Sequence, residues 1–216
     1  MNAAVEEEHI QGFCYNIRKH PHAVAWSVLL STAVIMEGFD ILLIQSLLAV
    51  DSFQRTFGRQ LPDGSYELTA AWQAGLTNGA IVGAIIGLMA GGIVADRYGF
   101  KKTMIGGLIA ITGLIFIPFF STGPVQLLIG LILLGCPWGL FQTITTTYAA
   151  DICPTGLRPY LTTYVNLCWV IGQLLASGVL VGVQDRPDDW AYRIPYALQW
   201  IWPVPIAIGV AFAPES

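Results

Sequence analysis

Six long apolar segments constrain this chain more than any other feature of its sequence. Each holds about 20 predominantly apolar residues, the length that an α-helix needs to cross the roughly 30 Å hydrocarbon core of a bilayer. Their approximate limits are 23–50, 71–95, 103–121, 125–150, 160–183 and 194–213. With only 11% charged residues, the chain also has too few polar groups to cover a soluble surface. We therefore predict an all-α membrane protein with six transmembrane helices.

The ends and the short loops predict how this bundle is oriented. The stretch "MNAAVEEEHI" is acidic, unlike the start of a signal peptide, so we expect residues 1–22 to form a cytosolic tail and residues 23–216 to form the bundle. If the spans alternate in direction, one side carries Arg18, Lys19, Arg97, Lys101, Lys102 and Arg158, and the other carries Arg55, Arg59, Arg186 and Arg193. The excess of basic residues on the first side predicts that both termini are cytoplasmic.

Several classes of function are disfavoured by composition. A net charge of −4 argues against a nucleic-acid partner. The histidines are His9, His20 and His22, all before the first span, so a membrane-embedded Ser/His protease or a histidine-ligated metal site has no histidine to use. We expect no enzymatic activity, metal or cofactor.

Two acidic residues interrupt the first apolar segment, in "MEGFDILL". Glu37 and Asp40 are three residues apart and share one helix face. A charged carboxylate at the centre of a membrane helix costs about 2.5–3.5 kcal/mol on insertion scales. The pair can bind a proton or substrate in a water-filled cavity, or it can be neutral or salt-bridged and purely structural. Because acids inside membranes usually serve function, we favour the first interpretation for Asp40 and leave both open for Glu37.

Amides and indoles in the fourth and fifth segments predict a sugar site. "GCPWGLFQ" holds Trp138 and Gln142, and "NLCWVIGQ" holds Asn166 and Gln173, which lie two helical turns apart. Amides exchange hydrogen bonds with sugar hydroxyls, and aromatic faces cover the apolar faces of the ring. The alternative is that these amides hold membrane helices together.

Glycine and proline positions predict packing and bends. In the second segment a glycine recurs every fourth residue, at Gly75, Gly79, Gly83, Gly87 and Gly91, and forms a stripe on which another helix can pack closely. The stripe can be a static seam or a surface that slides during function. Pro195, Pro203 and Pro205 predict kinks in the last segment.

One loop resembles the signature of the major facilitator superfamily. "GGIVADRYGFKK" is similar to the loop between helices two and three of that family, in which glycines flank an Asp-Arg pair and basic residues follow. The matching residues are Gly92, Asp96, Arg97, Gly99, Lys101 and Lys102, whereas Phe100 stands where a basic residue is usual. The resemblance implies a cytosolic gate that opens and closes during alternating access. The alternative is that these charges only fix the topology.

Further motifs resemble the sugar porters of that superfamily. "YAADICPTGLRPYLTTYVNLCWVIGQL" is similar to their pattern from helix four into helix five, with Asp151 in place of the usual glutamate and Arg158 retained as a second pair of gate residues. The final "PES" resembles the motif after helix six. "GCPWGLFQ", "LTTYVNLCW" and "LQWIWP" are similar to fungal α-glucoside (maltose-type) permeases.

The resemblance also implies roles for single residues. Asp40 would be the proton-coupling acid with Glu37 assisting, and Asn166 and Gln173 would occupy positions where sugar porters carry sugar-binding glutamines. Two residues depart from the family pattern. Leu131 replaces the arginine that pairs with the helix-one acid in hexose symporters, and Ala84 replaces a helix-two acid of proton-coupled α-glucoside members.

The resemblance finally implies a fold and a function for the whole chain. The family has twelve spans, so we expect these six to be the amino-terminal half of that fold, a fragment that lacks its carboxyl-terminal half. The expected activity is symport of an α-glucoside disaccharide with a proton across the fungal plasma membrane, by alternating access. The alternatives are a facilitative sugar uniporter and a transporter-like sensor that binds sugar without moving it.

Overall fold

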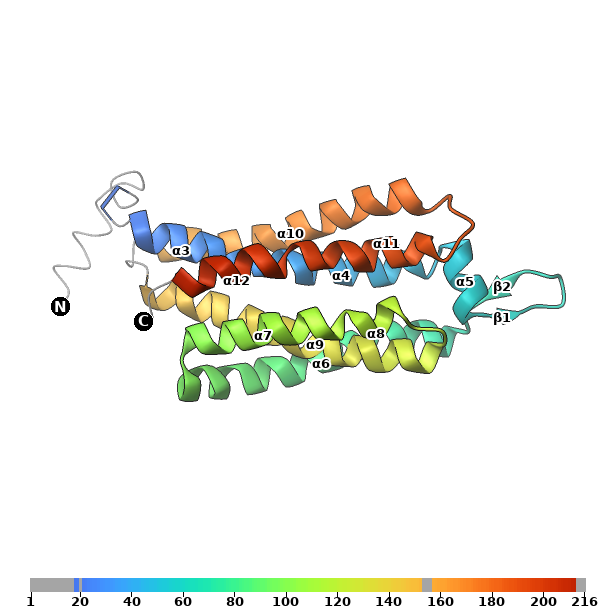
Figure 1. The fold of residues 1–216 in the computed structure, drawn as a ribbon, viewed down its shortest axis with the longest axis horizontal. Helices are drawn as coiled ribbons and strands as arrows, with labels where there is room; N and C mark the ends of the chain where they lie inside the picture. The colour runs from blue at the N-terminus through green and yellow to red at the C-terminus, as the bar shows by residue number, and fades with distance from the viewer. Residues whose placement is uncertain (1–17, 20, 153–156, 213–216) are drawn as a thin grey trace.

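The computed structural model describes residues 18–19, 21–152 and 157–212. Within them lie six apolar helical spans: Val24–Leu47, Ala70–Tyr98, Phe100–Phe119, Pro124–Ala150, Arg158–Val183 and Trp190–Phe212. The spans run side by side along the long axis of the molecule (Figure 1). The predicted six-helix bundle is therefore confirmed, with span limits that differ by only a few residues.

Three of the spans are built from more than one helix. The first comprises α3 (Pro21–Ser31) and α4 (Ala33–Leu47), and the third comprises α7 (Phe100–Leu114) and α8 (Phe116–Phe119). The sixth comprises α11 (Trp190–Leu198), the 3-10 turn η1 (Gln199–Ile201) and α12 (Pro203–Phe212). The second, fourth and fifth spans are the continuous helices α6 (Ala70–Tyr98), α9 (Pro124–Ile152) and α10 (Arg158–Val183).

A short helix and a two-stranded hairpin cap one end of the bundle (Figure 1). They are α5 (Asp51–Phe57) and the antiparallel strands β1 (Arg59–Gln60) and β2 (Tyr66–Glu67). The turn between the strands contains Pro-Asp-Gly, residues 62–64, where Gly64 has a φ of 87°. The Asp63 carboxylate accepts hydrogen bonds from the hydroxyl and the backbone N–H of Ser65, at 2.7 and 3.1 Å, and these bonds lower the pKa of Asp63.

The second and fourth spans form the first of two tightly packed helix pairs. Along α6 the glycine stripe faces α9, and a Cβ added at Gly83 or Gly87 would clash with a backbone carbonyl of α9. The contact is reciprocal, because a Cβ at Gly135 or Gly139 of α9 would clash with a carbonyl of α6. The predicted packing seam is confirmed from Gly79 to Gly91, whereas a Cβ at Gly75 would meet open space.

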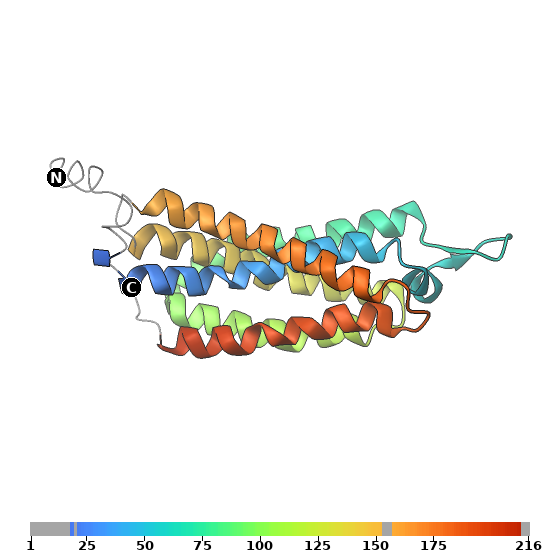
Figure 2. The same ribbon diagram turned by 90° about the horizontal axis from the view of Figure 1, so that it is seen from above.

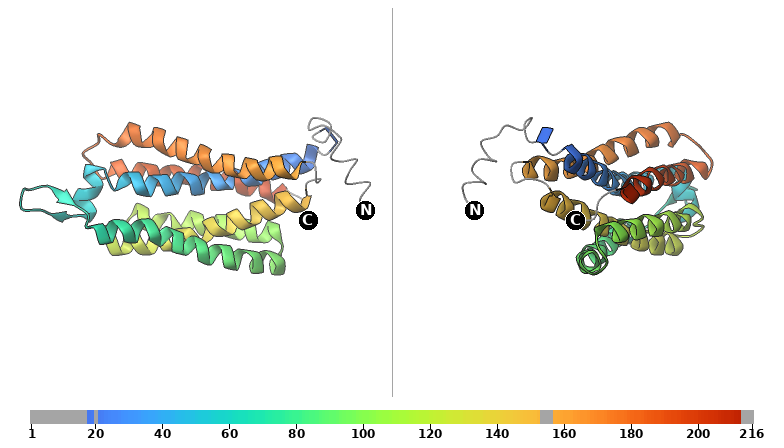
Figure 3. Two further views of the ribbon diagram at one scale, coloured as in Figure 1. Left: turned by 180° about the vertical axis from the view of Figure 1, so that it is seen from behind. Right: turned by 60° about the vertical axis from the view of Figure 1, so that its left-hand side comes forward.

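The first and fifth spans form the second pair. A Cβ at Gly38 of α4 would clash with the carbonyl of Trp169, and a Cβ at Gly172 of α10 would clash with the carbonyl of Ile35. Helices α4 and α10 lie side by side in Figures 2 and 3. These two pairs, α6 with α9 and α4 with α10, contact each other much less than their members contact one another.

The α-helical pattern is interrupted in the first and sixth spans. The first is interrupted at Thr32, whose hydroxyl donates to the Leu29 carbonyl at 2.5 Å. The sixth changes to the 3-10 turn η1 shortly before Pro203. Since proline has no N–H to donate to the carbonyl of Gln199, the α-helical pattern is interrupted there, whereas the predicted kinks stay a prediction. Pro195 lies inside α11 without breaking it.

Candidate functional site

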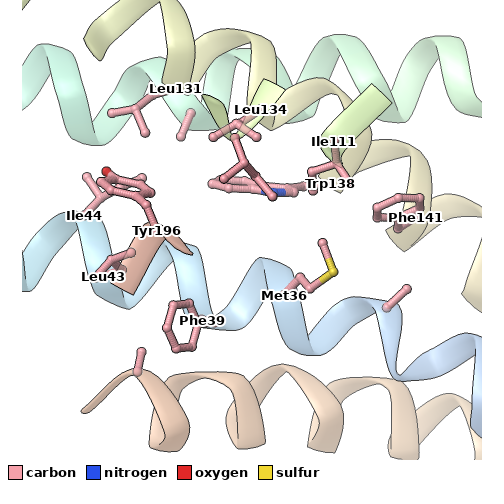
Figure 4. Close-up of a cluster of buried hydrophobic side chains, with 14 of the residues drawn as sticks. Met36, Phe39, Leu43, Ile44, Ile111, Leu131, Leu134, Trp138, Phe141 and Tyr196 are labelled. Atoms are coloured by element: carbon pink, nitrogen blue, oxygen red, sulfur yellow. The ribbon is translucent and has the colours of Figure 1, made fainter. Parts of the chain in front are cut away.

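The two membrane acids lie in the middle of α4 and face the interior of the bundle. Glu37 is 6% exposed and Asp40 is 1% exposed. Their surroundings are apolar: Met36, Phe39, Leu43 and Ile44 of the same helix face Leu131, Leu134 and Trp138 of α9, with Tyr196 of α11 beside them (Figure 4). Leu131, which replaces the arginine of hexose symporters, is a buried member of this cluster.

Asp40 is held by a residue from the sixth span. The side-chain Nε2 of Gln199 donates a hydrogen bond to Oδ1 of Asp40, and Gln199 is fully buried. The indole N–H of Trp138 also points toward the Asp40 carboxyl without forming a hydrogen bond of good geometry. Among the described residues, four buried polar atoms here have no partner: Glu37 Oε2, Asp40 Oδ2, Trp138 Nε1 and Gln199 Oε1. Buried polar atoms are rarely left unpaired, so these atoms provide positions for a proton or a small polar ligand.

A cavity of about 230 Å³ opens beside the acids, between α4, α6 and α9. Its polar lining residues are Glu37, Gln45, Thr77, Trp138 and Gln142, and its remaining lining is aliphatic, including Ala84. The cavity thus joins one of the two acids with the indole and the amide that the sequence predicted for sugar binding. Asp40 lies behind this cavity and is not part of its lining.

The two predicted sugar-binding amides of the fifth span lie elsewhere. Asn166 is exposed and Gln173 is half-buried on α10, and neither lines the cavity beside Glu37. Both flank the buried stripe of α10 that packs on α4, which contains Val165, Cys168 and Gly172. Their role in sugar binding stays a prediction.

The predicted gate residues gather at the end of the bundle opposite the hairpin. Gly99 has a φ of 86°, a conformation that favours glycine, and it joins α6 to α7 with its N–H bonded to the Ala95 carbonyl. Gly92 lies one turn before Asp96, with open space where a Cβ would point. Four gate residues are charged and described in full: Asp96, Arg97 and Lys102 are exposed, and Lys101 is half-buried.

Arg97 makes a further contact, Arg158 is the fifth charged gate residue that the structure describes, and Asp151 is described only in part. The Arg97 guanidinium lies over the ring of Tyr98, 5.8 Å from its centroid. Arg158 is exposed at the first turn of α10. The backbone of Asp151 belongs to the last turn of α9, but its side chain lies outside the described residues. The role of all of these residues as a gate stays a prediction.

Three polar residues of this region were missed by the sequence reasoning. Gln45 and Thr77 line the cavity, and Gln199 binds Asp40. The signal for Gln199 was an amide inside an apolar span, four residues before the proline of "LQWIWP". An isolated amide of this kind does not reveal its partner, because Asp40 is 159 residues away along the chain.

Comparison with known proteins gives three close resemblances. The chain is 42% identical to the general alpha-glucoside permease of Saccharomyces cerevisiae, over 100% of this chain and 35% of that protein. It is 42% identical to the maltose permease MAL31 of the same yeast, over 93% of this chain and 33% of that protein. Among solved structures, the proton:xylose symporter XylE of E. coli, bound to 6-bromo-6-deoxy-D-glucose, superposes with a TM-score of 0.77 at 19% identity, over 94% of this chain and 46% of that chain.

The chain matches only part of each of these proteins. The chain spans about a third of the length of the curated relatives and about half of the solved transporter. The fold is that of one six-helix half of a major facilitator superfamily transporter. The family model described as "Sugar (and other) transporter" matches residues 26–216. The chain therefore belongs to the sugar transporter family.

Proposed function

We propose that this chain is the amino-terminal half of a transporter that moves an α-glucoside together with a proton across the fungal plasma membrane, with its amino terminus in the cytoplasm. The observation that carries the proposal is the cavity of about 230 Å³ in which Glu37 meets Trp138 and Gln142. An acid, an indole and an amide in one membrane cavity supply the groups that proton-coupled sugar binding requires.

The sugar would bind against α9. The face of Trp138 would cover an apolar face of a pyranose ring, while Gln142 can both donate to and accept from sugar hydroxyls. The threonines beside Gln142 contribute less, because their hydroxyls donate to carbonyls of their own helix; Thr146, for example, donates to the Gln142 carbonyl at 2.7 Å. The choice of an α-glucoside follows the yeast permeases that resemble the chain.

The proton would be carried by the two acids of α4. Glu37 opens onto the cavity, and Asp40, one turn further along, is shielded from it. A proton that enters with the sugar can therefore reach Glu37 directly and Asp40 through it. Asn166 and Gln173, on the neighbouring α10, would complete the sugar site together with a second six-helix half that closes over the cavity. The gate residues at the end of α6 would close the cytosolic side.

The test is sugar uptake in yeast that lacks α-glucoside transporters, with the chain expressed from the complete reading frame that encodes it. Addition of maltose to an unbuffered suspension should raise the external pH while labelled maltose enters the cells. Asp40→Asn should abolish the pH rise, and Asp185→Asn, in an exposed loop, should preserve it.

Each alternative predicts a different outcome of this assay. Maltose entry without a change in external pH would identify a facilitative uniporter and would remove the proton-coupling role of Asp40. Binding of maltose without entry would indicate a sensor. Retention of coupling in Asp40→Asn would show that the proton is carried elsewhere.

A further inference from the structure

We infer that Gln199 is the positioning residue that holds Asp40 in both of its protonation states and ties that acid to the 3-10 turn of the sixth span. The inference rests on the proposed function, because it assumes that Asp40 gains and loses a proton. It concerns a side chain that neither the sequence motifs nor the cavity lining single out.

The contact between the two residues uses only part of their hydrogen-bonding capacity. Gln199 donates through Nε2 to Oδ1 of Asp40, whereas Gln199 Oε1 and Asp40 Oδ2 both lack a partner among the described residues. A carboxylate accepts from the amide N–H, and a protonated carboxyl can donate its O–H to the amide oxygen. The two groups can therefore stay hydrogen-bonded whether or not Asp40 carries the proton.

An amide differs in this respect from a cationic partner. An arginine has only donors and is always charged, so it stabilises the ionised carboxylate and offers no acceptor for the O–H of the protonated one. In this chain Leu131 fills the buried surface of α9 near α4, and the amide of Gln199 comes instead from the sixth span. The groups around Asp40 are thus suited to both protonation states.

The position of Gln199 connects the acid to an interruption of the α-helix. Gln199 opens η1, its carbonyl accepts a 3.3 Å bond from the Trp202 N–H, and Pro203 follows. A change in how the amide meets Asp40 would therefore act on the joint between α11 and α12. Two titratable groups act on Asp40 electrostatically, namely Glu37 on its own helix and Tyr196 on α11, so both contribute to its titration and are left unchanged in the test.

The test is a pH titration of the purified protein, produced from its complete reading frame and placed in lipid nanodiscs, by infrared difference spectroscopy. The carboxylic-acid band that Asp40→Asn removes belongs to Asp40. In Gln199→Met both forms of Asp40 lose their partner, and the ionised form loses the stronger, charged hydrogen bond, so the pH at which this band is half lost should rise by about one unit. Gln184→Met, at an exposed site, should leave that pH unchanged.

Two further measurements keep the test decisive. If Gln199→Met does not fold, Gln199→Asn takes its place in the test. The shorter side chain cannot reach Asp40, so the pH at which the Asp40 band is half lost should rise by the same amount. In the unsubstituted protein labelled with 13C-glutamine, one amide carbonyl band should move as the Asp40 band titrates, and Gln199→Asn should remove that movement.

Three results would overturn the inference. They are an Asp40 band that does not titrate, a titration that is the same in Gln199→Met and Gln199→Asn as in the unsubstituted protein, and an equal shift in Gln184→Met. None of these readouts requires transport, so a failure of maltose uptake would reject the proposed function and leave the test of Gln199 standing.

Discussion

At the scale of single residues, Glu37 and Asp40 lie one helical turn apart and yet have different surroundings. Glu37 reaches the cavity shared with Trp138 and Gln142, whereas Asp40 is shielded and hydrogen-bonded to Gln199. Such a difference assigns separate tasks to two identical chemical groups. In the proposed transporter, Glu37 exchanges the proton with the cavity and Asp40 retains it.

Gln142 offers the most direct test of sugar binding at this scale. Its side chain lines the cavity, so Gln142→Leu should remove one hydrogen bond to the sugar, worth about 0.5–1.5 kcal/mol, and raise the KM for maltose up to about tenfold. Labelled uptake in the yeast assay measures the KM. Gln126→Leu, on an exposed turn of the same helix, is the matched control, and an equal KM for Gln142→Leu and the unsubstituted protein would exclude a sugar contact.

Part of this site was predictable from single residues and part was not. Carboxylates inside an apolar segment are costly, and that cost alone directed attention to Glu37 and Asp40. Trp138 and Gln142 were identified by their chemistry and do share a cavity with Glu37. The link from Asp40 to Gln199 depends on how the first and sixth spans pack, and local sequence contains no information about that contact.

At the scale of helices, two pairs joined by glycines organise the bundle. The stripe on α6 was predictable because its glycines recur every fourth residue. The partners of that stripe, Gly135 and Gly139, share this spacing only once, and Gly38 and Gly172 stand alone, so the sequence did not show which helices they join. The interruption of the helix before Pro203 was predictable from the missing N–H, whereas the break at Thr32 had no comparable signal.

The glycine seam can be tested with substitutions of two glycines that belong to the same stripe of α6. Gly83→Ala places a Cβ against the carbonyl of Ile132, so α6 and α9 must separate, at a cost of about 1–3 kcal/mol. Gly75→Ala meets open space and should be neutral or stabilising by up to about 1 kcal/mol, because alanine favours the helix. Thermal unfolding in detergent compares the two, and equal melting temperatures would contradict a tight seam at Gly83.

At the scale of the whole molecule, the chain is a six-helix half of a family fold. It covers 35% of the general alpha-glucoside permease and 46% of the xylose symporter. In a two-half transporter the substrate site lies at the interface of the halves. Residues such as Asn166, exposed on α10, would gain their partners there.

The size of the native protein tests this proposal. An antibody raised against residues 1–22 should detect a band about two to three times the 23.4 kDa of this chain, the ratio that those coverages imply. The 216-residue chain, expressed by itself and run on the same gel, is the size control. A native band that migrates with this control would contradict a second half on the same polypeptide and would direct the search to a separate subunit.

The two helix pairs have a consequence for how proton and sugar can be linked. The acids belong to α4 and so move with α10, whereas Trp138 and Gln142 belong to α9 and so move with α6. The cavity wall is thus divided between two units that are each locked by backbone contact and only loosely joined to one another. In the proposed transporter, any change in the spacing of these units would alter the proton site and the sugar site at the same moment, so coupling could arise from shared walls without a relay of side chains between two distant sites.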